Sequence, residues 1–268
     1  MVENSQAQNS LLIDLDGVVY QEGNLIAGAS ETLDWLERRQ VPHLYVTNTT
    51  SRPRDSLLQK FDKLGFDAAA GEIMTPIIAA REWLAEQGLH RAAMFVPPAT
   101  LRDFGDIEPV ALDGTESADA VIVGDLGEAW DFSLLNGAFR LLMQEPVPRL
   151  IALGMTRYWH GANGLQLDVA PFVKALEHAA SCEAVVVGKP APAFFEAALA
   201  KLGCTAEKAL MIGDDIVGDI DAAQRCGIRG IQVRTGKFRE PDLVRGIEPF
   251  ALLDSLADLP DWWLKNLS

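Results

Sequence analysis

The stretch LLIDLDGVV, residues 11–19, places two aspartates directly after an apolar run. Such a run is typical of a buried strand in a parallel sheet. Asp14 and Asp16 are two positions apart, so on an extended segment their side chains point the same way and can share one site. Gly17 lets the chain turn there and approach a ligand closely. Taken alone, the pattern is more typical of a strand cap than of a catalytic pair.

Outward from this stretch, short β-branched runs alternate with segments of helical period, which predicts a parallel sheet covered by helices. The strands are predicted near residues 11–15, 43–47, 184–187, 208–212 and 229–233. The helices are predicted near residues 30–40, 53–64, 192–202, 217–226 and 250–258.

A second α/β series lies between about 77 and 182, with strands near 93–96, 120–123 and 150–153 and helices near 75–87, 132–143 and 170–180. We therefore predict an α/β fold with two domains. A Rossmann-like parallel-sheet core would consist of residues 1–76 plus 183–268, and an inserted α/β cap domain of residues 77–182. One continuous large sheet is the alternative, and periodicity does not distinguish the two.

Two further polar clusters follow predicted strands. The stretch TNTT, residues 47–50, offers hydroxyls and backbone N–H groups that can hold an anion. It can equally cap the helix that follows. In GKP, residues 188–190, Lys189 would be a fixed cation at a helix entrance, and a solvated surface lysine is the alternative.

The last cluster, GDDIVGD at residues 213–219, holds three carboxylates on a turn between a strand and a helix. Asp215 or Asp219 can stabilise the helix N-terminus. Asp214 has no comparably simple structural role, which favours a functional one.

All the clusters are predicted beyond the carboxyl ends of strands, where ligands bind in open parallel sheets. Together they gather up to five aspartates and one lysine along one edge of a sheet. Carboxylates at close range repel one another unless a cation intervenes, and oxygen ligands of this kind suit Mg²⁺. Carboxylates, an anion-binding hydroxyl, a lysine and Mg²⁺ are together the groups that phosphoryl transfer needs.

With DLDGV at 14–18, Thr47, Lys189 and GDDIVGD at 213–219 in this order, the chain resembles the haloacid dehalogenase (HAD) superfamily. The 142-position step from Thr47 to Lys189 matches subclass IIA, the branch whose α/β cap is inserted between the second and third motifs.

Two longer stretches, 186–199 and 211–239, resemble phospholysine phosphohistidine inorganic pyrophosphate phosphatase-like hydrolases. Some members of that branch have a serine two positions after the nucleophile, whereas this chain has Asp16. The substrate preferences of the serine-bearing members therefore need not carry over.

The resemblance and the residues together imply a Mg²⁺-dependent phosphatase. Asp14 would attack phosphorus and form an aspartyl-phosphate, and Asp16 would act as the acid and base. Thr47, the backbone N–H of Asn48 and Lys189 would hold the phosphoryl group.

Mg²⁺ would be bound by Asp14, by the backbone carbonyl of Asp16 and by Asp214, while Asp215 and Asp219 would act through water or through these ligands. The expected substrates are small phosphomonoesters, phosphoramidates or pyrophosphate, and the sequence does not specify the leaving group.

Three other functions use part of this pattern. A receiver-like signalling domain is also phosphorylated on aspartate, but it is about half this length and usually starts with adjacent acids rather than DxD. A C–halogen hydrolase has no use for Asp16. A phosphate-binding relative that has lost turnover is disfavoured because every motif residue is present.

Composition limits the partners and the location. The formal charge of −15 disfavours nucleic acid as a partner. The first ten residues carry no apolar stretch, and no apolar run reaches the ~20 residues that span a bilayer. We therefore expect a cytoplasmic protein without a membrane partner. Three cysteines without a CxxC pair are expected to be buried free thiols.

Two aromatic stretches remain. Arg157 lies in RYWH, residues 157–160, a predicted polar loop of the cap that could select the substrate. A structural loop with Trp159 packed inward is the alternative. Trp262 and Trp263 predict a packed final helix, whereas an exposed pair would indicate a contact in a homo-oligomer.

Overall fold

The computed structural model describes residues 9–161 and 164–267. The chain forms two compact units, of which the first consists of residues 1–47, 57–74 and 189–268 and the second of residues 48–56 and 75–188. The extent of an inserted cap over residues 77–182 remains a proposal about domain organisation.

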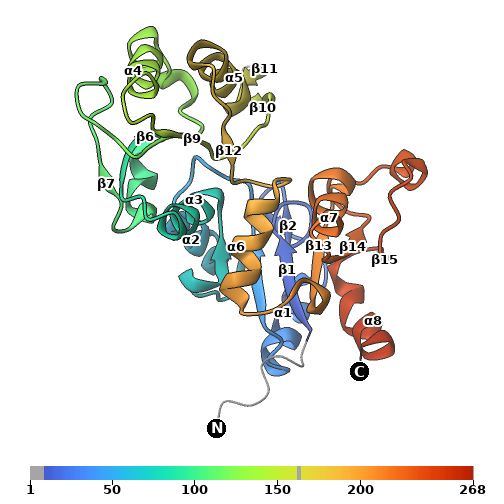
Figure 1. Ribbon diagram of the computed structural model, residues 1–268. Coiled ribbons are helices and arrows are strands. Elements are labelled where there is room, and N and C mark those ends of the chain that lie inside the picture. The colour runs from blue at the N-terminus through green and yellow to red at the C-terminus, as the bar shows by residue number, and fades with distance from the viewer. Residues whose placement is uncertain (1–8, 162–163, 268) are drawn as a thin grey trace. The chain divides into compact units, whose positions relative to one another are not determined.

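The first unit is built on a six-stranded parallel sheet with the order β15-β14-β13-β1-β4-β5 (Figure 1). Its strands are β1 (Ser10–Asp14), β4 (His43–Val46), β5 (Ile73–Met74), β13 (Ala209–Gly213), β14 (Arg229–Val233) and β15 (Ala251–Leu253). β1 lies between β13 and β4, and all five of its residues are buried. The parallel α/β class predicted from the alternating pattern is thereby confirmed.

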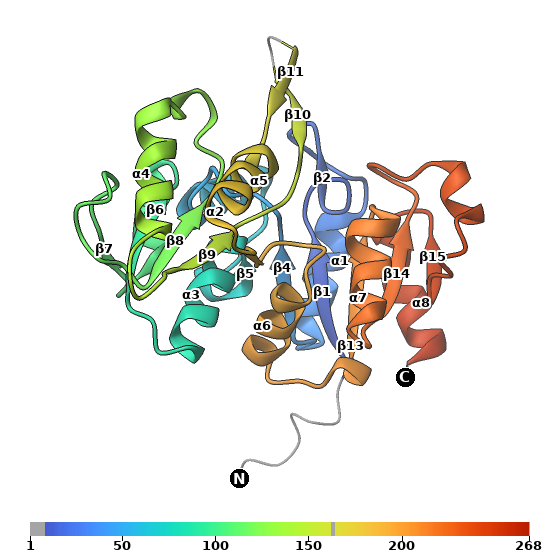
Figure 2. The same cartoon turned by 45° about the horizontal axis from the view of Figure 1, so that its top comes forward.

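Helices cover this sheet. They are α1 (Ala29–Arg38), α6 (Pro192–Leu202), α7 (Ala222–Arg225), α8 (Leu259–Asn266) and α2 (Arg54–Leu64), which begins in the second unit and ends in the first. The buried Leu33 of α1 and Trp263 of α8 share one apolar cluster with Leu11 and Ile13 of β1. The packed final helix predicted from the two tryptophans is therefore confirmed. In both views α6 and α7 lie in front of β1 and β13 (Figures 1 and 2).

The second unit has a five-stranded parallel sheet of its own, with the order β12-β9-β8-β6-β7. Its main elements are α3 (Pro76–Glu86), β6 (Arg91–Phe95), β7 (Glu108–Pro109), β8 (Ala120–Val123), α4 (Phe132–Leu142), β9 (Arg149–Ala152), α5 (Val169–Ala180) and β12 (Val185–Val186). Phe95, Trp130 and Phe172 form a stack of rings, with centroids 5.7 and 4.7 Å apart, which fixes α5 against β6.

The remaining elements are short. Two are hairpins, β2 (Tyr20–Gln21) with β3 (Asn24–Leu25) and β10 (Tyr158–Gly161) with β11 (Gly164–Leu167), and one is a π-helix, η5 (Ile216–Asp221). The 3-10 helices are η1 (Ala70–Glu72), η2 (Pro98–Phe104), η3 (Gly127–Ala129), η4 (Ala206–Lys208), η6 (Glu240–Val244) and η7 (Leu256–Asp258).

The prediction that residues 184–187 form a strand of the core sheet was wrong. β12 pairs with β9 of the second sheet, with Val185 opposite Ile151. Only two residues pair, and both are half-buried, so the apolar run carries no signal of which sheet it joins. The first sheet instead gains β5, which at two residues is too short for periodicity to reveal.

Two other local predictions were also wrong. Residues 250–258 are not a helix, because Ala251–Leu253 pair with β14 as an edge strand and only a 3-10 turn follows. The loop predicted over 157–160 is largely strand β10, paired in a hairpin with β11. The helix predicted over 217–226 is confirmed, and its first part is π-helical rather than α-helical. The side chains of Trp159 and His160 lie outside the described part of the structure.

The three cysteines are free thiols, as predicted, but they are half-buried rather than buried. Among the described residues, no helix is both long and apolar enough to cross a lipid bilayer.

Candidate active site

Asp14 is the last residue of β1, the strand at the centre of the first sheet. Strands on both sides fix its backbone, since Asp14 lies opposite Val46 of β4 and the preceding Ile13 lies opposite Ile212 of β13. Asp14 as a whole residue is 7% exposed. The carboxylate is therefore held at the carboxyl edge of the sheet with little access to water.

Lys189 joins two carboxylates of this edge. Its Nζ donates to Asp14 Oδ1 at 2.6 Å and to Asp219 Oδ1 at 2.8 Å. All three side chains are nearly enclosed, with 4% exposure for Lys189 and Asp219 and 10% for Asp14. The lysine is thus a buried bridge, and the solvated surface lysine considered from the sequence is excluded.

The carboxylates of the acidic turn after β13 have different structural roles. The Asp215 carboxylate accepts hydrogen bonds from Val217 N at 3.1 Å and Gly218 N at 2.9 Å, so it caps the π-helix. Asp219 lies within that π-helix, and its Oδ2 accepts from Asp215 N at 3.2 Å. Because Gly213 has no side chain, Asp219 can pack directly over the end of β13, where a Cβ would overlap its carboxylate.

Asp214 is held between two glycines. A Cβ on either Gly17 or Gly236 would overlap Asp214 Oδ2, and both glycines have positive φ angles, 85° and 63°. Oδ2 accepts a hydrogen bond from Lys237 N at 2.7 Å. The hydroxyl of Thr235 donates to the carbonyl of Gly17, which ties the two glycine segments together. Asp214 Oδ1, by contrast, is buried and has no hydrogen-bond partner among the described residues.

The cluster carries more negative than positive charge. Asp14, Asp214 and Asp219 each offer an oxygen within 4.8 Å of the others, and Lys189 bridges two of them, Asp14 and Asp219. Three carboxylates and one ammonium leave a formal surplus of two negative charges in a buried space.

The pKa values of Asp14, Asp214 and Lys189 reflect their burial and their charged neighbours. Burial raises the pKa of Asp14 to about 7, against the opposing effect of Lys189. Burial likewise raises the pKa of Asp214 to about 6, although the Lys237 N–H opposes the shift. For Lys189, burial lowers the pKa, but Asp14 and Asp219 outweigh burial and the net pKa lies above its ordinary value. The ammonium therefore stays charged.

These residues fit a divalent cation. The surplus of two negative charges matches its charge, the donors are all oxygens, and Asp214 Oδ1 is a buried acceptor that lacks a partner. Hard cations such as Mg²⁺ take such donors. The structure brings Asp219 into the cluster as closely as the two predicted carboxylate ligands, Asp14 and Asp214.

The other predicted site residues are not members of this group of three close carboxylates. Asp16 is exposed and does not belong to the group of close carboxylates. Thr47 follows β4 and is buried, and its N–H donates to Met74 O at 3.1 Å. Asn48 is exposed and belongs to the second unit, so its backbone role stays a prediction. Three of the four sequence clusters thus follow the neighbouring strands β13, β1 and β4.

Arg157 is exposed in the second unit, just before β10. Its guanidinium lies 5.9 Å from the ring centre of Tyr158, and its carbonyl accepts from Asp168 N at 3.1 Å. Neither contact tests its predicted role as a substrate selector.

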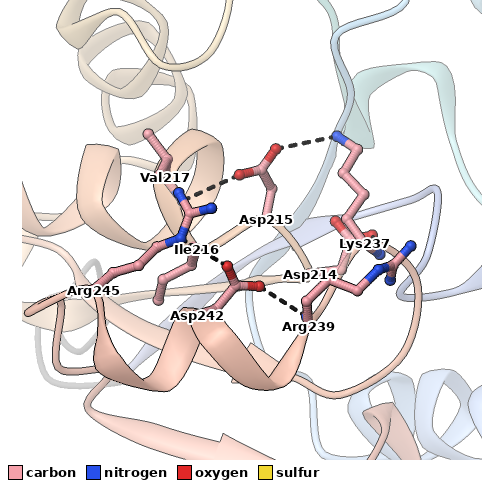
Figure 3. A pocket seen from close by; sticks show the side chains of 8 residues that line it. All are labelled: Asp214, Asp215, Ile216, Val217, Lys237, Arg239, Asp242 and Arg245. Carbon is pink, nitrogen blue, oxygen red and sulfur yellow. Dashed lines mark hydrogen bonds and ion pairs between the residues drawn. The ribbon is translucent and has the colours of Figure 1, made fainter.

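A pocket of about 200 Å³ lies beside Asp214 (Figure 3). Figure 3 shows Lys237 paired with Asp215, at 3.3 Å, on one side of it and Arg245 near Asp242 on the other. The pocket is lined by Asp214, Asp215, Ile216, Val217, Lys237, Arg239, Asp242 and Arg245.

Sequence reasoning missed the segment Thr235-Gly236-Lys237. The segment contributes a hydrogen bond from the Thr235 hydroxyl, a glycine without a side chain and the backbone N–H of Lys237. None of these is an acidic or nucleophilic side chain that a sequence motif would reveal. The one available signal was the glycine three positions after the end of β14, at the carboxyl end of that strand.

Two family descriptions match the chain. Residues 11–104 match the haloacid dehalogenase-like hydrolases, and residues 186–259 match a HAD-hydrolase-like family. The human phospholysine phosphohistidine inorganic pyrophosphate phosphatase is 40% identical over 96% of this chain and 94% of its own length. The bovine haloacid dehalogenase-like hydrolase domain-containing protein 2 is 41% identical over 98% of both chains.

A solved structure, the glycerol phosphate phosphatase of Mycobacterium tuberculosis in complex with calcium, is 28% identical and has a TM-score of 0.81. It is matched over 94% of this chain and 74% of its own. The acidic cluster at the edge of the parallel sheet is consistent with what these relatives show. The chain belongs to the haloacid dehalogenase-like hydrolases and is a phosphatase of that family.

Proposed function

We propose that this enzyme hydrolyses small phosphorylated molecules with Mg²⁺, through a covalent aspartyl-phosphate on Asp14. The observation that carries the proposal is the buried hydrogen bond of 2.6 Å between Lys189 and Asp14 at the end of the central strand. The bond holds one carboxylate oxygen of Asp14, Oδ1, beside a buried cation.

In the first step, Asp14 attacks phosphorus. A P–O bond to the carboxylate forms while the bond to the leaving oxygen breaks, and Asp16 gives a proton to that oxygen. The exposure of Asp16 supports this role, because an acid that serves the leaving group must be reachable, whereas the nucleophile is better shielded.

In the second step, a water molecule attacks the phosphorus of the aspartyl-phosphate and gives its proton to Asp16. The P–O bond to Asp14 breaks, inorganic phosphate leaves, and both carboxylates return to their starting protonation. The same residue thus acts as the acid and then as the base.

Lys189, Thr47 and the backbone N–H of Asn48 would hold the phosphoryl oxygens. The support for Lys189 is its fixed charge beside Asp14. The support for Thr47 is its buried place after β4, the strand next to Asp14.

Asp14, the carbonyl of Asp16 and Asp214 would hold Mg²⁺, with Asp219 and Asp215 orienting the site through Lys189 and the π-helix cap. When bound, Mg²⁺ would offset the charge that the phosphoryl group brings to the carboxylates.

The substrate class follows from the relatives, whose names include pyrophosphate, phospholysine, phosphohistidine and glycerol phosphate. We propose phosphomonoesters, phosphoramidates and pyrophosphate as candidates for this chain. A panel of these compounds, with an aryl phosphate as the reference, identifies the preferred leaving group.

The decisive experiment is phospho-enzyme trapping by acid quench in wild type and Asp14→Asn. We expect a labelled, acid-stable protein only in wild type and loss of aryl phosphate hydrolysis in the variant. Asp67→Asn, a change at an exposed aspartate, is the matched control and should behave as wild type. Undiminished turnover by Asp14→Asn, or by wild type in EDTA, contradicts the proposal.

A further inference from the structure

Asp16 lies in a tight turn that the backbone of Tyr20 closes on both sides. The N–H of Tyr20 donates to the carbonyl of Leu15 at 3.2 Å, and the carbonyl of Tyr20 accepts from the N–H of Gly17 at 2.8 Å. Leu15 and Gly17 are the residues directly before and after Asp16. Because Asp16 is exposed, packing of its own side chain contributes little to its placement. The position of Asp16 therefore depends on how firmly Tyr20 is held.

The ring of Tyr20 anchors this turn in the core of the first unit. Tyr20 is 1% exposed and belongs to the same apolar cluster as Leu11 and Phe61. The Nζ of Lys60 lies 3.2 Å from the centre of the Tyr20 ring. Lys60 is half-buried on α2, directly before Phe61. An ammonium is attracted to the negative face of an aromatic ring, and more strongly where water is partly excluded. The contact therefore ties the turn that carries Asp16 to α2.

This anchoring matters most in the step in which Asp16 acts as the base. In the proposed mechanism, the water that attacks the aspartyl-phosphate gives its proton to Asp16, so the carboxylate must lie within about 2.6–3.2 Å of that water. A misplacement of about 1 Å can cost about 100-fold in rate. An aryl leaving group departs with little help from an acid. Formation of the aspartyl-phosphate from an aryl phosphate therefore tolerates a displaced Asp16 better than its breakdown does.

We infer that Lys60 is a positioning residue for Asp16, and that it acts through the ring and the backbone of Tyr20. The inference rests on the proposed function and deepens it. It gives a role in acid–base catalysis to a residue of α2 that lies outside the acidic cluster.

The test is rapid-quench kinetics with an aryl phosphate and Mg²⁺, which measures formation and breakdown of the phospho-enzyme separately. Lys60→Met removes the ammonium but keeps a long side chain. We expect its breakdown step to slow about tenfold and its formation step to change by less than about twofold, so that phospho-enzyme accumulates. Lys60→Gln, which is also uncharged, should behave in the same way.

Two further variants show that the loss comes from the contact with the ring. Lys60→Arg keeps a cation that can lie over Tyr20 and should restore breakdown to within about twofold of wild type. Lys63→Met removes the same charge from an exposed lysine of the same helix and should match wild type. Thermal unfolding measures whether each variant is folded before its kinetics are recorded.

A positioning role also predicts that the effects of Lys60 and Asp16 are not additive. In Asp16→Ala the base is already absent, so the addition of Lys60→Met should slow breakdown no further. A residue that only stabilised the fold would slow both steps alike, and its effect would persist when Asp16 is replaced.

Two results overturn the inference: breakdown as fast in folded Lys60→Met as in wild type, or a full further loss when Lys60→Met is added to Asp16→Ala. Both leave the aspartyl-phosphate proposal intact, because the phospho-enzyme still forms. A wild type that forms no phospho-enzyme instead contradicts the proposed function itself, and the inference fails together with it.

Discussion

Lys189 Nζ lies 2.6 Å from Asp14 Oδ1, although 175 positions separate the two residues along the chain. The contact joins the end of β1 to the segment that precedes α6. Both side chains are nearly enclosed, so neither charge has water as an alternative partner. Removing one partner of such a buried pair leaves the other charge uncompensated, which costs far more than the pair itself contributes.

Lys189→Met is therefore expected to lower the free energy of unfolding by about 3 kcal/mol and to abolish turnover. Two carboxylates, Asp14 and Asp219, lose the cation that bridges them. Urea unfolding in EDTA measures the change. Lys201→Met, at an exposed lysine of α6, should change stability by less than about 0.5 kcal/mol. Equal stability of the two variants would show that the buried bridge is not formed in solution.

The pKa values of the cluster predict an unusual pH dependence in the absence of metal. Burial raises the pKa of Asp14 from 3.8 to about 7, so between about pH 4 and 7 the folded protein holds a proton that the unfolded chain has lost. Stability contributed by this group must then fall as pH rises through that window, by at most about 1.4 kcal/mol per pH unit.

Asp14→Asn cannot ionise, so its stability in EDTA should exceed that of wild type by a margin that grows from pH 4 to pH 7 and then stays constant. Unfolding of both proteins at several pH values measures the margin. With saturating Mg²⁺ the trend should reverse, because protons compete with the cation for the carboxylates. A margin independent of pH in EDTA would mean that Asp14 titrates near its ordinary pKa.

Asp16→Ala should separate the two catalytic steps. The exposed Asp16 lies outside the acidic cluster, so its loss should leave metal binding largely intact. General acid–base catalysis contributes typically 10²–10⁴-fold, and an aryl leaving group needs little help to depart. Breakdown of the phospho-enzyme should therefore slow more than its formation. Quench-flow trapping should detect more phospho-enzyme than in wild type, and accumulation no greater than in wild type would refute this assignment.

Arg157→Ala tests whether the second unit sets substrate preference. We expect a changed ranking of anionic phosphorylated substrates and nearly unchanged hydrolysis of a small aryl phosphate, which needs little beyond the catalytic groups. Arg149→Ala, at another exposed arginine of this unit, is the control. A uniform loss on every substrate, or no change on any, would assign Arg157 a structural role.

The sequence allowed the central strand and its acidic edge to be predicted, because each signal is local. Asp14 follows an apolar run, and the acidic turn at 213–219 follows another. Parallel pairing then brings these ends together without further information, since β13 and β1 are neighbours. The resemblance implied that Lys189 lies beside Asp14 and the phosphoryl group, whereas its second bond, to Asp219, was seen only in the three-dimensional structure.

Other features escaped prediction because their cause is not local. β12 has the apolar composition of a core strand, yet its partner is β9, and pairing partners are chosen by tertiary packing rather than by composition. Ala251–Leu253 reads as part of a helix, but the open edge of β14 offers backbone hydrogen bonds that a helix at this position would leave unused. Gly236 acts only through the absence of a side chain.

The division of the chain into units places Asp14, Lys189, Asp214 and Asp219 all within the first unit. The charged centre is thus complete without any residue from 75–188. The hydrogen bonds that join Lys189 to Asp14 and Asp219 use no side chain from that stretch. During evolution, therefore, sequence change within 75–188 would be less constrained by this charged centre than change at any of these four residues.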